Sequence, residues 1–192
     1  MNQLEVQDLL AKHGALMEGH FRLSSGRHSD RYVQKQKIME YPRVAASLAH
    51  QIAERFKDPG GYNFETVVSP AVGAIGLGTL VAFDAHSRFL FTERVEDQMT
   101  FRRGQALKGN ERVLVVEDIV TTGGSAAEVV ETVKASGATL VGVAALVDRG
   151  SRDLPFSLTS LCKVDAADWD PAECPMCARD EPMTAPGSRG LV

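Results

Sequence analysis

Cysteine is scarce in this sequence, and long apolar runs are missing from it. Three cysteines in 192 residues are too few for a disulfide framework. No apolar run approaches the roughly 20 residues that a membrane-spanning helix needs. The first residues also lack the basic stretch followed by an apolar one that marks a signal peptide. We therefore expect a cytoplasmic chain with no membrane partner.

Clustered positive charge is missing as well. The 21 Lys and Arg residues are outnumbered by 25 Asp and Glu residues, which gives a net charge of −4. Because nucleic-acid binding depends on clustered cations that neutralise phosphates, this composition argues against a nucleic-acid partner. Hydrophobic residues make up 44% of the chain and charged residues 24%, as in ordinary globular proteins. A chain of this length suits one domain with its own hydrophobic core.

Helix and strand patterns alternate through the middle of the chain. Apolar residues at helical spacing or in Gly-rich context predict helices over 4–12, 42–56, 73–83 and 125–136. Short apolar runs predict strands over 66–69, 88–92, 113–117 and 139–147. This alternation indicates an α/β fold with a doubly wound, mostly parallel sheet. In addition, 20–33 predicts two short extended pieces joined by a Ser/Gly turn, and the polar segment 93–105 predicts a long exposed loop.

One strand–turn–helix segment carries most of the chemical information. The strand over 113–117 delivers two adjacent carboxylates, Glu117 and Asp118, to its carboxyl end, where open α/β sheets bind ligands. In the turn that follows, Gly123 and Gly124 let the backbone approach a ligand closely. Backbone N–H groups and the dipole of the next helix can then hold a phosphate. The two carboxylates are suited to accept hydrogen bonds from sugar hydroxyls, with Mg²⁺ screening a nearby diphosphate.

The string 113–125, VLVVEDIVTTGGS, contains neither a Walker motif nor a dinucleotide fingerprint. It resembles the phosphoribosyl pyrophosphate (PRPP) signature of the type I phosphoribosyltransferases. Flanking pieces narrow the resemblance to the orotate phosphoribosyltransferase family; they lie at 19–29, 69–73, 93–104, 146–150 and 170–177. The resemblance implies a single phosphoribosyltransferase domain over 1–192, made of an N-terminal helix and small hood (1–40), an α/β core (41–165) and a C-terminal tail (166–192).

The resemblance also implies the reaction and the residues that carry it out. PRPP and orotate would give orotidine 5′-monophosphate and diphosphate in pyrimidine nucleotide biosynthesis, with Mg²⁺ as cofactor. Residues expected to bind PRPP are Glu117, Asp118, Ile119, Val120, Thr121, Thr122, Gly123, Gly124, Ser125, Arg94, Val72 and Gly73. Those expected to bind orotate are Thr121, Arg149, Ser24 and Ser25, with the planar guanidinium of Arg149 facing the orotate carboxylate. Those expected to be catalytic are Arg94, Asp118 and Gln98.

The segment 94–103 is expected to close over the site and to be shared across the interface of a homodimer, as in the family. It departs from the family pattern at Gln98, where many relatives carry a lysine. Since glutamine is neutral and Asp97 lies beside it, positive charge at the diphosphate falls to Arg94, Arg102 and Arg103. Ser24 stands at another position that is often basic in relatives. Two alternatives therefore stay open, a phosphoribosyltransferase for another base and a PRPP-binding regulator with little catalysis.

The remaining metal-ligand residues do not make a recognisable motif. Cys174 and Cys177 form a single C-x-x-C, whereas a structural zinc site needs four ligands. The third cysteine, Cys162, comes with no obvious fourth partner, so we assign no metal ligands and expect a reduced structural tail, and whether Cys174 and Cys177 bind metal stays open. His20 and His28 lie in a turn-rich segment, and we expect each to be structural or exposed rather than a general base.

Overall fold

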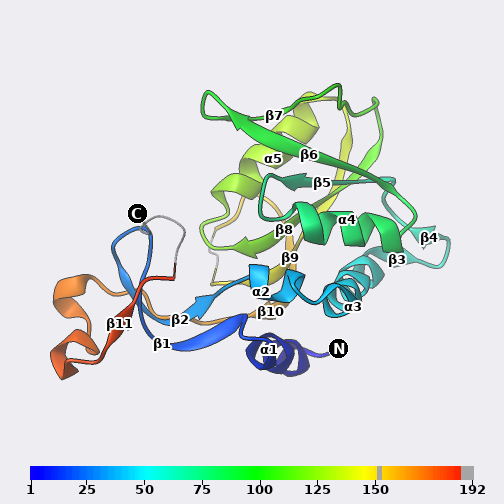
Figure 1. Cartoon of the computed structure of the whole chain (residues 1–192). Coiled ribbons are helices and arrows are strands. Elements are labelled where there is room, and N and C mark those ends of the chain that lie inside the picture. The colour runs from blue at the N-terminus through cyan, green and yellow to red at the C-terminus, as the bar shows by residue number, and fades with distance from the viewer. Residues whose placement is uncertain (151–152, 187–192) are drawn as a thin grey trace.

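The computed structural model describes residues 1–150 and 153–186, which form a six-stranded sheet flanked by helices and a three-stranded sheet at one end (Figure 1). The helices are α1 (Gln3–Lys12), α2 (Gln36–Met39), α3 (Pro42–Ala53), α4 (Ile75–Asp84) and α5 (Gly124–Ala135). The strands are β1 (Leu16–Arg22), β2 (His28–Val33), β3 (Lys57–Asp58), β4 (Gly61–Tyr62), β5 (Thr66–Pro70), β6 (Arg88–Val95), β7 (Gln98–Phe101), β8 (Arg112–Val120), β9 (Thr139–Asp148), β10 (Leu158–Lys163) and β11 (Met183–Thr184). Short 3₁₀ turns lie at Glu54–Phe56, Pro171–Glu173 and Cys177–Arg179.

The central sheet has the strand order β10-β9-β8-β5-β6-β7 and is parallel except for β7. From β5 the chain moves to one side to form β6, and it then crosses to the other side to form β8, β9 and β10. The order therefore reverses between β5 and β8. In doubly wound sheets, ligands bind in the crevice outside the carboxyl ends of the strands at such a reversal.

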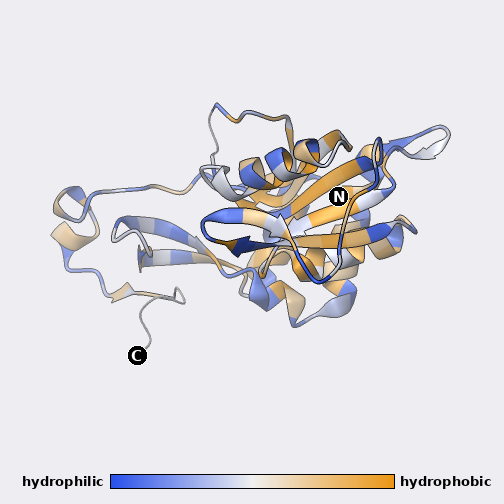
Figure 2. Cartoon of the chain, turned by 90° about the horizontal axis from the view of Figure 1, so that it is seen from above, coloured by the Kyte–Doolittle hydropathy of each residue, from blue (hydrophilic) through white to orange (hydrophobic). Residues whose placement is uncertain are grey.

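Alternate residues of β8 enter the two hydrophobic layers that cover this sheet. Leu114 and Val116 pack in a cluster with residues of α1, α3 and α4. Val113 and Val115 pack in a second cluster with residues of α5. Because both faces are covered, the strand is apolar from Val113 to Val116, and Figure 2 shows the central strands mostly in orange. The predicted α/β fold with a doubly wound, mostly parallel sheet is confirmed.

Local sequence fixes where the helices begin. Asn2 and Glu5 form a reciprocal capping box at the start of α1. Pro42 occupies the first turn of α3, where its missing N–H leaves no hydrogen bond unmade. The helices predicted over 4–12, 42–56 and 125–136 are confirmed, with the last turn of the second in 3₁₀ form, and the helix predicted over 73–83 begins at Ile75. Among the described residues, no helix has the length and apolar character needed to span a membrane.

The strands β1, β2 and β11 form a small hood beside the core. β1 and β2 are antiparallel and joined by the predicted Ser/Gly turn. β11 comes from the C-terminal tail and pairs with β1, while Trp169 exchanges two backbone hydrogen bonds of 2.9 Å with His28. The tail therefore completes the hood, although residues 187–192 of the predicted tail lie outside the described residues. The domain boundaries themselves stay a prediction.

The prediction of a long exposed loop over 93–105 is wrong for its first half. β6 continues to Val95 and turns back through Glu96 and Asp97 into the antiparallel β7. Both turn residues have positive φ, which is the backbone that a two-residue hairpin turn of matching twist requires. The hairpin packs on α5, where the Thr132 hydroxyl donates a 2.7 Å hydrogen bond to the Met99 carbonyl.

Candidate active site

The turn after β8 forms a cradle at the start of α5. Gly123 is the residue before the helix and has a left-handed backbone with φ of 78°. The left-handed conformation favours glycine, and a side chain there would also displace the end of the Leu154 side chain. No side chain caps the first turn of α5. Its N–H groups therefore remain available for a bound anion, which the positive end of the helix dipole favours.

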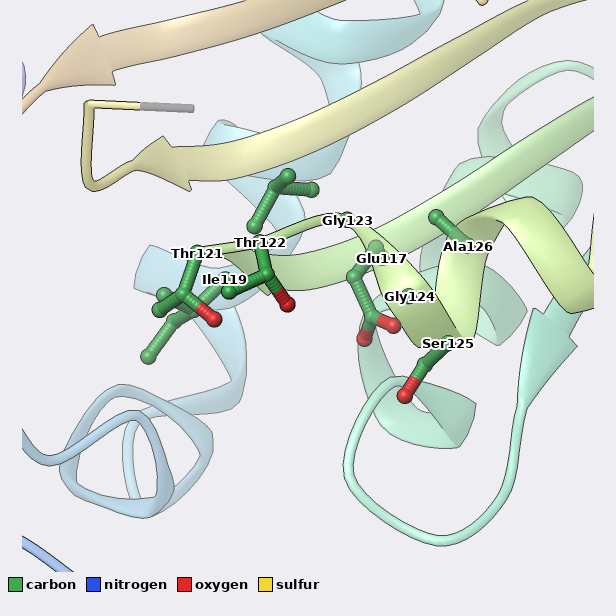
Figure 3. A pocket seen from close by; sticks show the side chains of 9 residues that line it. Glu117, Ile119, Thr121, Thr122, Gly123, Gly124, Ser125 and Ala126 are labelled. Atoms are coloured by element: carbon green, nitrogen blue, oxygen red, sulfur yellow. The ribbon is translucent and has the colours of Figure 1, made fainter. Parts of the chain in front are cut away.

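The hydroxyls of this turn lie on the same side as a carboxylate from the end of β8. Figure 3 shows the oxygen atoms of Thr121, Thr122 and Ser125 pointing the same way as those of Glu117. Together with their neighbours they line one hollow, formed by Glu117, Ile119, Val120, Thr121, Thr122, Gly123, Gly124, Ser125 and Ala126. The structure thus brings together the PRPP-binding residues predicted on 117–125, except for Asp118, which lies in the adjoining hollow.

That second hollow lies between the ends of β5 and β8. It is lined by Lys35, Pro70, Ala71, Gly73, Met99, Glu117, Asp118, Ile119 and Ser125. Because Glu117, Ile119 and Ser125 line both hollows, the two are continuous. Gly73, predicted at the diphosphate, belongs to this second hollow, while Val72 is 82% exposed beside it.

Two buried carboxylates meet where the hollows join. Glu117 is 7% exposed and Asp118 is 3% exposed. Burial raises the pKa of Glu117 to about 8, and the nearby Asp118 carboxylate acts in the same direction. The Asp118 N–H donates a 3.0 Å hydrogen bond to Glu117 Oε1. An acid held this far above its ordinary range is typical of a site that receives a ligand.

Lys35 is a site residue that the sequence analysis missed. Its ammonium forms an ion pair with Asp118, and the lysine side chain is 29% exposed. A Cβ at Gly73 would overlap this ammonium, so glycine leaves the space that the ion pair occupies. The available signal was weak, because Lys35 precedes the one-turn helix α2 in a polar stretch that matches no motif.

The hairpin β6–β7 carries the residues expected at the leaving diphosphate. Arg94 forms a 2.7 Å ion pair with Glu128 of α5, and Arg103 forms one of 3.1 Å with Glu93. Gln98 is exposed at the first position of β7. None of these three polar side chains lines either hollow, so their predicted roles require the hairpin or a partner subunit to bring them there.

Arg149 follows β9 and points toward the hood. Its backbone N–H donates a 2.8 Å hydrogen bond to the Val120 carbonyl, which ties it to the end of β8. Its Nη2 lies 3.4 Å from the hydroxyl of Ser29, whereas its buried Nε has no hydrogen-bond partner among the described residues. Burial lowers the pKa of this guanidinium. Ser24 and Ser25, predicted to contact the same base, lie in the exposed turn between β1 and β2 and line neither hollow.

Comparison with known proteins agrees with this geometry. The family model of the phosphoribosyl transferase domain matches residues 35–172. Over its whole length the chain is 44% identical to the orotate phosphoribosyltransferase of Desulforamulus reducens, of which it covers 100%. The chain belongs to the orotate phosphoribosyltransferase family. The family member of Thermotoga maritima is 45% identical over 188 residues, which are 97% of this chain and 99% of that protein.

A solved structure shares the fold. The crystal structure of orotate phosphoribosyltransferase from Aeropyrum pernix superposes with a TM-score of 0.70, over 83% of this chain and 93% of that one, at 24% identity. The predicted family, the enzyme class of phosphoribosyltransferase and the function in pyrimidine biosynthesis are confirmed by the full-length relatives. The individual residue roles are not tested by these likenesses and stay predictions.

Proposed function

We propose that this chain joins N1 of orotate to C1 of the ribose 5-phosphate of PRPP, releasing diphosphate, at the crevice between β5 and β8. The observation that carries this proposal is the uncapped first turn of α5 next to two buried carboxylates. The turn over 121–125 would hold the 5-phosphate through N–H and hydroxyl donors. Glu117 and Asp118 would accept hydrogen bonds from the ribose hydroxyls, which fixes the anomeric carbon for attack.

Mg²⁺ fits the same carboxylates. Asp118 Oδ2 is buried, and among the described residues it has an ion pair with Lys35 but no hydrogen bond of good geometry. Carboxylate oxygens are the hard ligands that Mg²⁺ prefers, and the ion usually keeps substrate phosphates and water as its other ligands. We propose that Glu117 and Asp118 hold Mg²⁺ together with PRPP. The ion would supply positive charge to the departing diphosphate.

The orotate carboxylate is proposed to bind Arg149. The guanidinium has a buried Nε with a free N–H, and a carboxylate can accept from Nε and one Nη in parallel. The Ser29 hydroxyl already accepts a hydrogen bond of 3.4 Å from Nη2, which ties the guanidinium to β2 of the hood. Thr121, which follows the Val120 carbonyl bonded to the Arg149 N–H, and Ser24 and Ser25 of the hood turn are proposed to complete the base site.

Positive charge at the diphosphate is proposed to come from Lys35 in this subunit and from the β6–β7 hairpin. Because Arg94 is paired with Glu128 and Arg103 with Glu93, each must exchange its carboxylate for the diphosphate when the hairpin closes. We propose that this happens within a cytoplasmic homodimer, in which the segment 94–103 of one subunit serves the crevice of its partner. The three free cysteines agree with a reducing compartment.

The test is orotate consumption by the purified chain with PRPP and Mg²⁺, followed by ultraviolet absorbance and by diphosphate release. We expect stoichiometric loss of orotate and no product from adenine or hypoxanthine. The double variant Glu117→Gln, Asp118→Asn should lose at least a thousandfold in kcat/KM while keeping its circular dichroism spectrum. Glu131→Gln, which removes an exposed carboxylate from the same α5, is the matched control. Full activity in a folded double variant would refute the proposed ribose site.

A further inference from the structure

A cluster of two histidines and two cysteines lies in the hood, apart from the active site. His20 comes from β1, His28 from β2, and Cys174 and Cys177 from the tail that runs beside these strands (Figure 1). Their ligand atoms all lie within 4.8 Å of one another. His20 and His28 are each 5% exposed and Cys174 is 3% exposed. His20 and Cys174 are 154 positions apart in the sequence, so the C-x-x-C seemed to lack partners.

Four of the six separations between these atoms match the edges of a tetrahedral metal centre. His20 Nε2 lies 3.0 Å from His28 Nδ1, 3.5 Å from Cys174 Sγ and 3.6 Å from Cys177 Sγ. Cys177 Sγ lies 3.3 Å from His28 Nδ1. Around Zn²⁺, with bonds of about 2.0–2.1 Å to nitrogen and 2.3 Å to sulfur, tetrahedral edges are roughly 3.3 Å for N–N and 3.6 Å for N–S. The observed separations differ from these edges by a few tenths of an ångström.

The hydrogen bond on the far side of one imidazole supports a ligand role. His20 Nδ1 lies 3.0 Å from the carbonyl oxygen of Glu181, which can only accept. Nδ1 must therefore carry the proton, and the lone pair of Nε2 is left facing the cluster. Such a carbonyl behind a ligating histidine fixes its tautomer and ring orientation in metal sites.

We propose that His20, His28, Cys174 and Cys177 bind one structural Zn²⁺ that fastens the C-terminal tail to the hood. Four protein ligands of the N₂S₂ type fill a tetrahedral shell and leave no position for a substrate, so the ion serves the fold and not the transfer reaction. The other contacts of the tail with the hood are short-range: β11 is two residues long, Trp169 adds a single bridge to His28, and Ala167 and Asp168 contact Asp30 and Arg27. Binding would thus supply folding free energy to this part of the chain.

Two measurements on the full-length protein, purified without chelator, test the site. Elemental analysis should give one zinc per chain, and Co²⁺ substitution should give the visible absorption of tetrahedral thiolate ligation. Cys174→Ser, Cys177→Ser should lower the zinc content at least tenfold. Cys162→Ala, which removes the remaining cysteine, should keep the ion, because Cys162 lies on β10 beside the Leu146 carbonyl.

The sole tryptophan gives a readout that does not depend on activity. The backbone of Trp169 is hydrogen-bonded to that of His28, so chelation of zinc should change the tryptophan fluorescence. It should also lower the thermal unfolding midpoint of the protein by roughly 5–10 °C. Zn²⁺ should reverse both effects, and Mg²⁺ should reverse neither. Two results would overturn the proposal: less than one zinc in ten chains with no uptake on titration of the reduced wild-type protein, or a Cys174–Cys177 disulfide as the native state of the purified chain.

Discussion

Replacing Glu117 by glutamine should change how the stability of the protein depends on pH. Glu117 is buried, and burial raises its pKa from an ordinary 4.5 to about 8. Between those two values the folded protein keeps a proton that the unfolded chain has released. The folded state therefore binds more protons, and the free energy of unfolding falls as pH rises through this window. Glutamine cannot ionise, so the free energy of unfolding of the variant lacks this dependence on pH.

The size of the effect follows from the pKa values. A shift from 4.5 to about 8 corresponds to about 5 kcal/mol, at 1.36 kcal/mol for each unit. The stability gained by the variant over the wild type should be small at pH 4.5. It should grow by about 1.4 kcal/mol per pH unit and level off above pH 8.

Urea unfolding followed by far-ultraviolet circular dichroism, at several pH values between 5 and 9, measures this difference. Glu131→Gln is the control, because Glu131 is exposed and forms an ion pair with its helical neighbour Lys134. Its difference from wild type should stay within about 0.5 kcal/mol at every pH. A Glu117→Gln difference that is equally flat would show that Glu117 ionises normally in the fold. Glu117 would then lack the raised pKa that marks it as a residue of a ligand site.

Three further substitutions test the crevice. Gly73→Ala should reduce kcat/KM at least tenfold, because the added methyl group displaces Lys35 from Asp118; an unchanged value would show that the ion pair is dispensable. Arg149→Gln should raise the KM for orotate about 10- to 100-fold and leave the KM for PRPP within about threefold, as expected for loss of one charge-assisted contact. Gln98→Lys should raise kcat severalfold in steady-state assays if hairpin charge limits turnover, and no rise would mean that Lys35 and the arginines already suffice.

The sequence predicted the core well because its strands are buried on both faces. The run 113–116 is apolar without alternation, and only a covered parallel sheet explains such a run next to a Gly-rich helix start. The same logic fails at the edges of the sheet. β7 has only four residues, in which exposed Gln98 and Thr100 alternate with Met99 and Phe101 of the core, so the polar segment around it resembles a loop. β10, at the opposite edge, gave no signal that stood out from its surroundings.

Local motifs likewise predicted only half of each site. The strand–turn–helix of 117–125 was recognisable because one continuous segment builds the whole phosphate cradle. Lys35 and the ligand partners of Cys174 reach their sites through tertiary structure, across 83 and 154 residues of chain. Sequence spacing carries no information on such pairs, since the loop closure that joins them depends on the fold.

The hood and the core share a polar contact in addition to their apolar packing, and this contact connects the proposed metal cluster to the proposed base site. Ser29, whose hydroxyl accepts a hydrogen bond from Arg149, is the neighbour of His28 on β2. Asp30, the next residue, accepts a 2.8 Å hydrogen bond from Ala167 N–H in the tail. Because adjacent strand residues point to opposite faces, an ion bound to His28 on one face would fix the position of Ser29 on the other. The position of the Arg149 side chain thus depends on the same strand that closes the hood.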